Sequence, residues 1–202
     1  MSLPVKVKLT DAEINRFCDT AIQRLSSINA ISADVASFVN KYREHMLTSS
    51  QSVTPPMAGY SHIIDFMNED VPLCWDIPKL MASTAKGQRE LLSTHQVTSL
   101  IDTRFFDDPF GRSYSEGPIL LAEIPMCIPQ YCVIDGNHRA IQAFKSGDPM
   151  IPAIVYPHQS HMEYMSPYSK LLFTICLNIV AFSIYVEGKI SDTDFEEMLL
   201  PL

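Results

Sequence analysis

The chain has 202 residues, of which 47% are hydrophobic, and carries a formal net charge of −8 with a pI near 5.1. This length and composition predict one compact folded domain with an additional lobe, and they exclude general disorder. The acidic balance argues against a high-affinity, nonspecific grip on DNA, which needs clustered lysine and arginine, although it leaves room for a local basic cleft.

The cysteine pattern and the hydrophobic runs indicate a protein of the reducing cytoplasm. Its five cysteines are odd in number and lack Cys-x-x-Cys spacing, which argues against a disulfide scaffold or a zinc site. Residues 1–9 lack the apolar core of a signal peptide. The uncharged run 171–186 is shorter than the roughly 20 apolar residues of a membrane span, so we predict a buried core helix and no transmembrane segment. A membrane span is the alternative.

Two amphipathic helices are predicted at the N-terminus. Thr10 and Glu13 form a capping box ahead of apolar residues at helical spacing, which predicts a helix over 10–27. Ser32 begins a second helix over 32–48. One face of it carries Val35, Phe38, Val39, Tyr42 and Met46. We expect Phe17, Ile22, Phe38 and Val39 to be buried in a lobe that packs on the core; the alternative is a surface that binds a partner.

Residues 57–98 give weaker patterns. The stretch 59–67 suggests a short helix, and Pro72 and Pro78 bracket a loop that buries Trp75. Pro78 suits the first turn of a helix that runs to about Thr94.

A long polar loop follows at 107–118. It holds Asp107, Asp108, Arg112, Tyr114, Ser115 and Glu116, a dense set of acidic, basic and metal-binding groups. Loops on a rigid scaffold often carry function, and the alternative here is a solvated surface turn.

Three strands and a helix are predicted over 117–156. Apolar runs at 117–124, around Val133 and at 150–156 are typical of buried strands, and helical spacing begins after Gly136. The expected fold class is α+β, with a small mixed sheet at 99–157. Helical segments are expected to flank it at 1–98 and 158–202, within one compact domain overall.

The turn at Asp135-Gly136 is the strongest candidate site. Gly136 can adopt a positive φ, and backbone N–H groups and the positive end of a helix meet there. His138 and Arg139 lie at the same point, so the turn favours an anion, most plausibly a phosphate. The alternative is an ordinary turn in which both side chains cap the helix or face solvent.

The C-terminal part contains two further features. His158 and His161 are three residues apart, a spacing that suits a metal pair on a helix, but a loop is the favoured interpretation. Ser191 begins a last short acidic helix.

The order strand, strand, Gly136-Asn137-His138-Arg139, helix, strand over about 100–157 resembles the ParB/sulfiredoxin superfamily. In that superfamily a Gly-x-x-Arg turn binds a nucleotide phosphate. Sulfiredoxins carry a cysteine where this chain has Asn137, so sulfinic acid reduction is not expected. The chain length, the flanking helices and the Asp-Gly-Asn-His-Arg turn are similar to plasmid fertility-inhibition proteins, including the oncogenic suppression activity proteins. These are described as ATPases and DNases that block conjugative transfer.

This resemblance implies ATP and Mg²⁺, or another divalent cation, as cofactors. The phosphate- and nucleotide-binding residues would be Gly136, Asn137, His138, Arg139, Arg112 and Ser115. The catalytic residues would be Glu116, Asp135 and His138, with Asp135 and Glu116 also holding the metal.

Three functions remain open from the sequence. The first is an ATP-hydrolysing, metal-dependent nuclease that acts on transfer DNA, and basic residues beside the turn would favour it. The second is a small-molecule kinase of the serine type, favoured by a closed pocket able to hold an amino acid. The third is a non-catalytic inhibitor that binds a conjugation or type IV secretion component, favoured by an exposed apolar stripe on the N-terminal helices.

Overall fold

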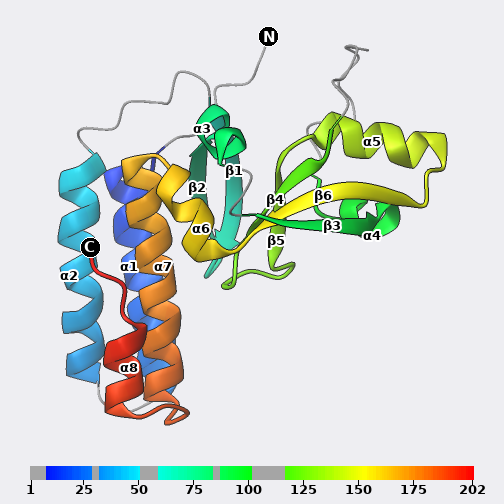
Figure 1. Ribbon diagram of the computed structural model, residues 1–202. Helices are drawn as coiled ribbons and strands as arrows, with labels where there is room; N and C mark the ends of the chain where they lie inside the picture. Colours follow the sequence, from blue (N-terminus) through cyan, green and yellow to red (C-terminus); the bar gives the residue numbers. More distant parts are fainter. Residues whose placement is uncertain (1–7, 29–31, 51–58, 84–86, 102–116) are drawn as a thin grey trace. The chain divides into compact units, whose positions relative to one another are not determined.

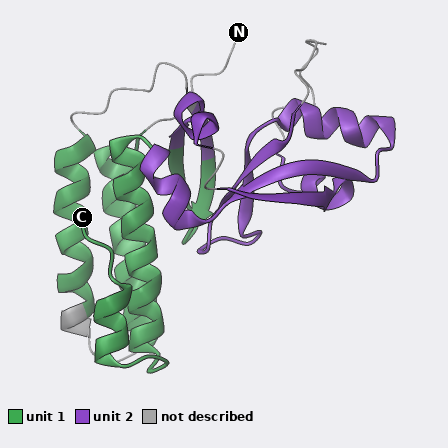
Figure 2. Ribbon diagram, viewed as in Figure 1, with its two compact units in different colours: residues 1–55, 63–73, 165–202 green, residues 56–62, 74–164 purple. Residues whose placement is uncertain are grey.

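A computed structural model describes residues 8–28, 32–50, 59–83, 87–101 and 117–202, which form a mixed α+β protein (Figure 1). The chain divides into two compact units (Figure 2). Unit 1 comprises residues 1–55, 63–73 and 165–202, and unit 2 comprises residues 56–62 and 74–164. The N-terminal and C-terminal helical segments, separate flanks in the sequence, therefore belong to one unit.

Unit 1 contains the helices α1 (Asp11–Ile28), α2 (Ser32–Ser50), α7 (Pro167–Val186) and α8 (Asp192–Met198), which lie side by side in Figure 1. The predicted N-terminal helices are thus confirmed. The capping box of α1 is also confirmed, because Thr10 N–H donates to Glu13 Oε2 at 2.8 Å and Glu13 N–H donates to Thr10 Oγ1 at 3.3 Å. The predicted last acidic helix is α8, with its own capping box at Ser191 and Asp194.

The core of unit 1 is the helix α7. It is long and apolar enough to span a membrane, but 56% of its most apolar window is buried. The prediction of a buried core helix is confirmed. Helices α1 and α2 both pack against it, and Phe38 stacks on Phe182 with ring centroids 4.2 Å apart. Phe17 and Val39 are fully buried, and Ile22 and Phe38 are largely buried, as predicted.

A two-stranded hairpin, β1 (Gly59–Phe66) and β2 (Glu69–Asp76), replaces the short helix predicted over 59–67. The two strands are joined by a turn at Met67-Asn68, where both residues have positive φ angles of 57° and 64°. The helix prediction is wrong because this turn lacks the glycine by which such turns are usually recognised in a sequence. Asp65 Oδ1 supports it by accepting from Asn68 N–H at 3.0 Å. Trp75 is fully buried as predicted, but it lies on β2 rather than in a loop.

Unit 2 is built on a four-stranded sheet in the order β3-β6-β4-β5. The strands are β3 (Gln88–Ser93), β4 (Ile119–Glu123), β5 (Tyr131–Asp135) and β6 (Met150–Tyr156), and helix α5 (Asn137–Ser146) joins the last two. Strands β4 and β6 are parallel and the other pairs antiparallel. The predicted strand, strand, helix, strand in one mixed sheet is confirmed, whereas the expectation of helices elsewhere is wrong for β1, β2 and β3.

The helix predicted from Pro78 to about Thr94 is also wrong. Helix α3 spans only Ile77–Ala82 and ends where Ser83 Oγ donates to the Leu80 carbonyl at 2.7 Å. Strand β3 follows. It lies at the sheet edge and exposes residues 88–91, so it carries no alternation of apolar and polar residues that would reveal a strand.

Helices cover both faces of the sheet. Helices α4 (Thr94–Thr98) and α5 cover one face around Leu121, Val133 and Ala153. On the other face Tyr156 is buried and its hydroxyl donates to the Leu80 carbonyl at 3.4 Å. Helix α6 (His158–His161), which contacts β4, and a 3-10 turn η3 (Met162–Tyr164), which contacts α3, complete unit 2. The loop expected at 157–161 is therefore wrong.

Candidate functional site

The turn between β5 and α5 has the backbone geometry that the sequence predicts. Gly136 adopts φ 89° and ψ 20° as the residue before the first turn of α5, and Ala140 N–H donates to its carbonyl at 3.0 Å. A Cβ at Gly136 would lie 2.8 Å from Arg139 Nη2 and 2.9 Å from both Arg139 Nε and Ile119 Cγ2. Only glycine therefore fits, because the guanidinium lies directly against its Cα.

Arg139 is held at this point by Asp135. Its Nη2 donates to Asp135 Oδ2 at 2.6 Å, and the arginine side chain is 16% exposed. A largely buried, charge-assisted hydrogen bond of this length fixes the orientation of the guanidinium. The same bond occupies one oxygen of the Asp135 carboxylate, the group that the resemblance implies as a metal ligand.

Asn137 ties the turn to the hairpin strand β1. Its side chain is only 4% exposed, and Nδ2 donates to the Tyr60 hydroxyl at 3.3 Å. Its Oδ1 is buried and has no hydrogen-bond partner in the described part of the chain. The Tyr60 ring stacks on His62 with centroids 6.4 Å apart. The sequence does not predict the role of Tyr60, because a contact between residues 77 positions apart leaves no local signal in the chain.

The structure brings together part of the predicted set. Asp135, Gly136, Asn137, His138 and Arg139 share the turn. Arg112, Ser115 and Glu116 lie outside the described residues, as do Asp107, Asp108 and Tyr114. Within the described residues, no group of three or more His, Cys, Asp or Glu side chains could hold a metal ion.

A second polar cluster lies at the opposite end of the sheet, where β4 and β6 end. Glu123 Oε2 accepts from the backbone N–H of His158 at 3.0 Å and contacts its Nδ1 at 2.8 Å. Burial alone would raise the pKa of the Glu123 carboxyl, but the hydrogen bonds and charge of His158 outweigh it, and the net shift is downward.

His161 is fully buried beside this pair. Its Nδ1 accepts from Trp75 Nε1 at 3.2 Å, and its Nε2 lies 2.7 Å from the Glu123 carbonyl oxygen. Because the indole N–H only donates, the imidazole proton resides on Nε2 and is donated to that carbonyl. Burial lowers the pKa of His161 to about 4. Neither nitrogen retains a lone pair for a metal, so the arrangement does not support a His158–His161 metal pair.

No protein-family model, no curated protein and no solved structure matches this chain.

Gly136→Ala is expected to lower the free energy of unfolding of unit 2 by about 2–4 kcal/mol, the combined cost of a left-handed alanine and a steric clash. Gly147→Ala is the matched control. Gly147 has a φ of 76°, but nothing lies within 4 Å of a Cβ built there, so it should lose only about 1–2 kcal/mol. Urea unfolding followed by the emission of Trp75, the single tryptophan, measures both. Equal losses would show that the contact with Arg139 is unimportant.

Proposed function

We propose that the turn Gly136–Arg139 binds the phosphate of a nucleotide, ATP in the first instance, within a ParB/sulfiredoxin-like unit. The observation that carries the proposal is the guanidinium of Arg139 against Gly136, at the start of α5. The glycine lets the guanidinium lie against the first turn of α5, where the helix N-terminus and the arginine both supply positive charge to an anion.

The buried Asn137 oxygen supports a nucleotide in preference to a bare phosphate. An amide oxygen accepts hydrogen bonds only, so it suits a ribose hydroxyl or a base amino group and not a phosphate oxygen. Burial of such an atom without a donor costs free energy, which a bound donor would recover.

The side chains around the turn can be assigned roles in ATP hydrolysis. Arg139 would hold phosphate oxygens, and His138 would move a proton to or from the reacting group. Asp135 would orient Arg139 and, with Glu116, would hold Mg²⁺. That ion would supply charge stabilisation and offset the repulsion between the carboxylate and the phosphate. Arg112 and Ser115 would complete the phosphate contacts.

By the same resemblance, we propose that ATP hydrolysis accompanies metal-dependent DNA cleavage that inhibits conjugative or T-DNA transfer. The net charge of −8 requires any contact with DNA to be local. The alternative of a partner-binding N-terminal hairpin is less well supported, because its apolar face packs against α7.

Calorimetric titration with ATP, ADP and CTP, with and without Mg²⁺, tests the proposal. We expect wild type to bind ATP and Arg139→Ala to lose about 1.5–3 kcal/mol of binding free energy, the scale of a charge-assisted hydrogen bond. Arg139→Lys should recover only part of the loss, because an ammonium lacks the planar fork. Arg89→Ala, an exposed arginine on β3, is the control and should bind as wild type. The absence of nucleotide binding by wild type would remove the proposal.

Glu116→Ala separates binding from chemistry. It should leave the affinity for ATP nearly intact and lower the rate of phosphate release, since a base or metal ligand acts on the reaction more than on binding. A normal rate would move the catalytic role to Asp135 or to Asp107 and Asp108. Cleavage of single- and double-stranded DNA with Mg²⁺, measured on the same variants, tests the nuclease activity.

A further inference from the structure

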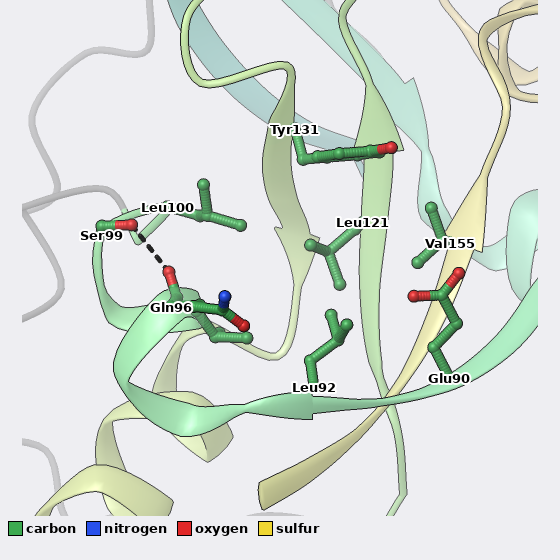
Figure 3. A pocket seen from close by; sticks show the side chains of 9 residues that line it. Glu90, Leu92, Gln96, Ser99, Leu100, Leu121, Tyr131 and Val155 are labelled. Atoms are coloured by element: carbon green, nitrogen blue, oxygen red, sulfur yellow. Dashed lines mark hydrogen bonds between the residues drawn. The ribbon is translucent and has the colours of Figure 1, made fainter.

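A pocket of about 340 Å³ opens on the α4 side of the sheet of unit 2 (Figure 3). Its apolar part is formed by Leu92, Leu121 and Val155, one residue from each of three neighbouring strands. The volume lies at the small end of the range for ligand sites, and the apolar lining is typical of them.

This pocket is separate from the Gly136 turn. Tyr131, which lines it, pairs with Glu123 at one end of β5, whereas Asp135 pairs with Leu120 at the other. Four residues of strand place the two ends roughly 13 Å apart.

The polar groups of the pocket favour a cationic ligand. Among its lining residues in the described chain, Glu90 alone is charged. Figure 3 shows Glu90, Val155 and Tyr131 along one side and Gln96 and Ser99 along the other. Ser99 Oγ donates its proton to the Gln96 carbonyl at 2.7 Å, so it is left as an acceptor toward the pocket. The carboxylate of Glu90 and the aromatic ring of Tyr131, on the same side of the pocket, are groups that hold an ammonium.

We propose that this pocket binds a small apolar amine, with its hydrocarbon part on Leu92, Leu121 and Val155 and its ammonium beside Glu90 and Tyr131. Among the described residues, the lining carries no lysine or arginine, so it offers no cationic side chain to the carboxylate of an amino acid or to a phosphate. The lining therefore favours an amine over an amino acid, the substrate class of a serine-type kinase. The proposal does not depend on nucleotide binding at the turn.

Titration of the ¹⁵N-labelled protein with 2-phenylethylamine tests this site, and 3-phenylpropionate serves as the probe of opposite charge. We expect the amine to shift the amide signals of β3, α4 and Tyr131, and to bind about tenfold more tightly than the carboxylate, since reversing one charge beside a carboxylate changes the free energy by roughly 1.4 kcal/mol. No binding of the amine, equal binding of both probes, or shifts confined to other elements would overturn the proposal.

Two variants identify the residues responsible. Glu90→Gln should weaken amine binding about threefold to fivefold, a modest effect because the carboxylate is exposed to solvent. Glu197→Gln, an exposed glutamate on α8, is the matched control and should leave the affinity unchanged. Ser99→Trp, at an exposed rim position, should abolish binding of the amine by filling the pocket. Wild-type affinity in either Glu90→Gln or Ser99→Trp would contradict the assignment.

Discussion

Replacing Trp75 with alanine is expected to lower the free energy of unfolding of unit 2 by about 3–5 kcal/mol, the usual cost of removing a buried tryptophan side chain. Trp75 is fully buried, and its ring meets His161 edge-on with centroids 5.9 Å apart. The substitution leaves a cavity and also removes the donor to His161 Nδ1. A buried acceptor without a donor adds its own desolvation cost.

Trp75→Phe divides the two contributions. Phenylalanine retains most of the apolar volume but cannot donate, so we expect a smaller loss of about 1–2 kcal/mol. Met81→Ala, half-exposed on α3, is the control and should change stability by less than about 0.5 kcal/mol. Both Trp75 variants lose the single tryptophan, so fluorescence cannot report on their unfolding. Hydrogen exchange of the β4 and β6 amides measures the unfolding of unit 2 instead. A loss below about 1 kcal/mol in Trp75→Ala would show that the fold repacks around the gap.

The elements predicted from sequence are those whose signals are local. Thr10 and Glu13 cap α1 within four residues, and the apolar face of the helix follows at once. The β5–Gly136–α5 segment is likewise predicted from local features: an apolar strand, a glycine, and apolar residues at helical spacing. The same local signals predict that Asp135 to Arg139 share one turn, and their role in binding stays a prediction.

The missed elements depend on partners distant in the chain. Strand β3 is defined by its pairing with β6, in which Arg89 lies opposite Ile154, 65 residues further along the chain. The β3 sequence of Gln, Arg, Glu and Leu by itself favours a helix. The hairpin turn at Met67-Asn68 lacks a glycine. The Asn137–Tyr60 bond spans 77 residues, and the pocket collects side chains from α4 and all four strands of the sheet. Such arrangements leave no periodicity to read.

Acidification from pH 7 to pH 4 is expected to destabilise unit 2 by about 3 kcal/mol through His161 alone, the free energy of a pKa difference between 6.5 and about 4. The unfolded chain binds a proton at this imidazole below pH 6.5, whereas burial keeps it neutral in the folded protein down to about pH 4. The contribution of His161 to the free energy of unfolding is therefore fully present above pH 6.5, falls as the pH drops, and is lost below about pH 4. The pKa of Glu123 is lowered in the folded protein, so its protonation at acidic pH also lowers the free energy of unfolding.

His161→Gln isolates this contribution. A glutamine amide can accept from Trp75 Nε1 through its oxygen and donate to the Glu123 carbonyl through its nitrogen, as the neutral imidazole does, but it does not titrate. The variant should therefore show a flatter dependence of stability on pH between 6.5 and 4. His95→Gln, an exposed histidine on α4, is the control and should keep the wild-type dependence. Urea midpoints from Trp75 emission at each pH measure the effect, and parallel profiles for wild type and His161→Gln would show that His161 is protonated in the folded state. That result would in turn require Trp75 or the Glu123 carbonyl to move away from the ring, because a doubly protonated imidazole cannot accept the indole N–H.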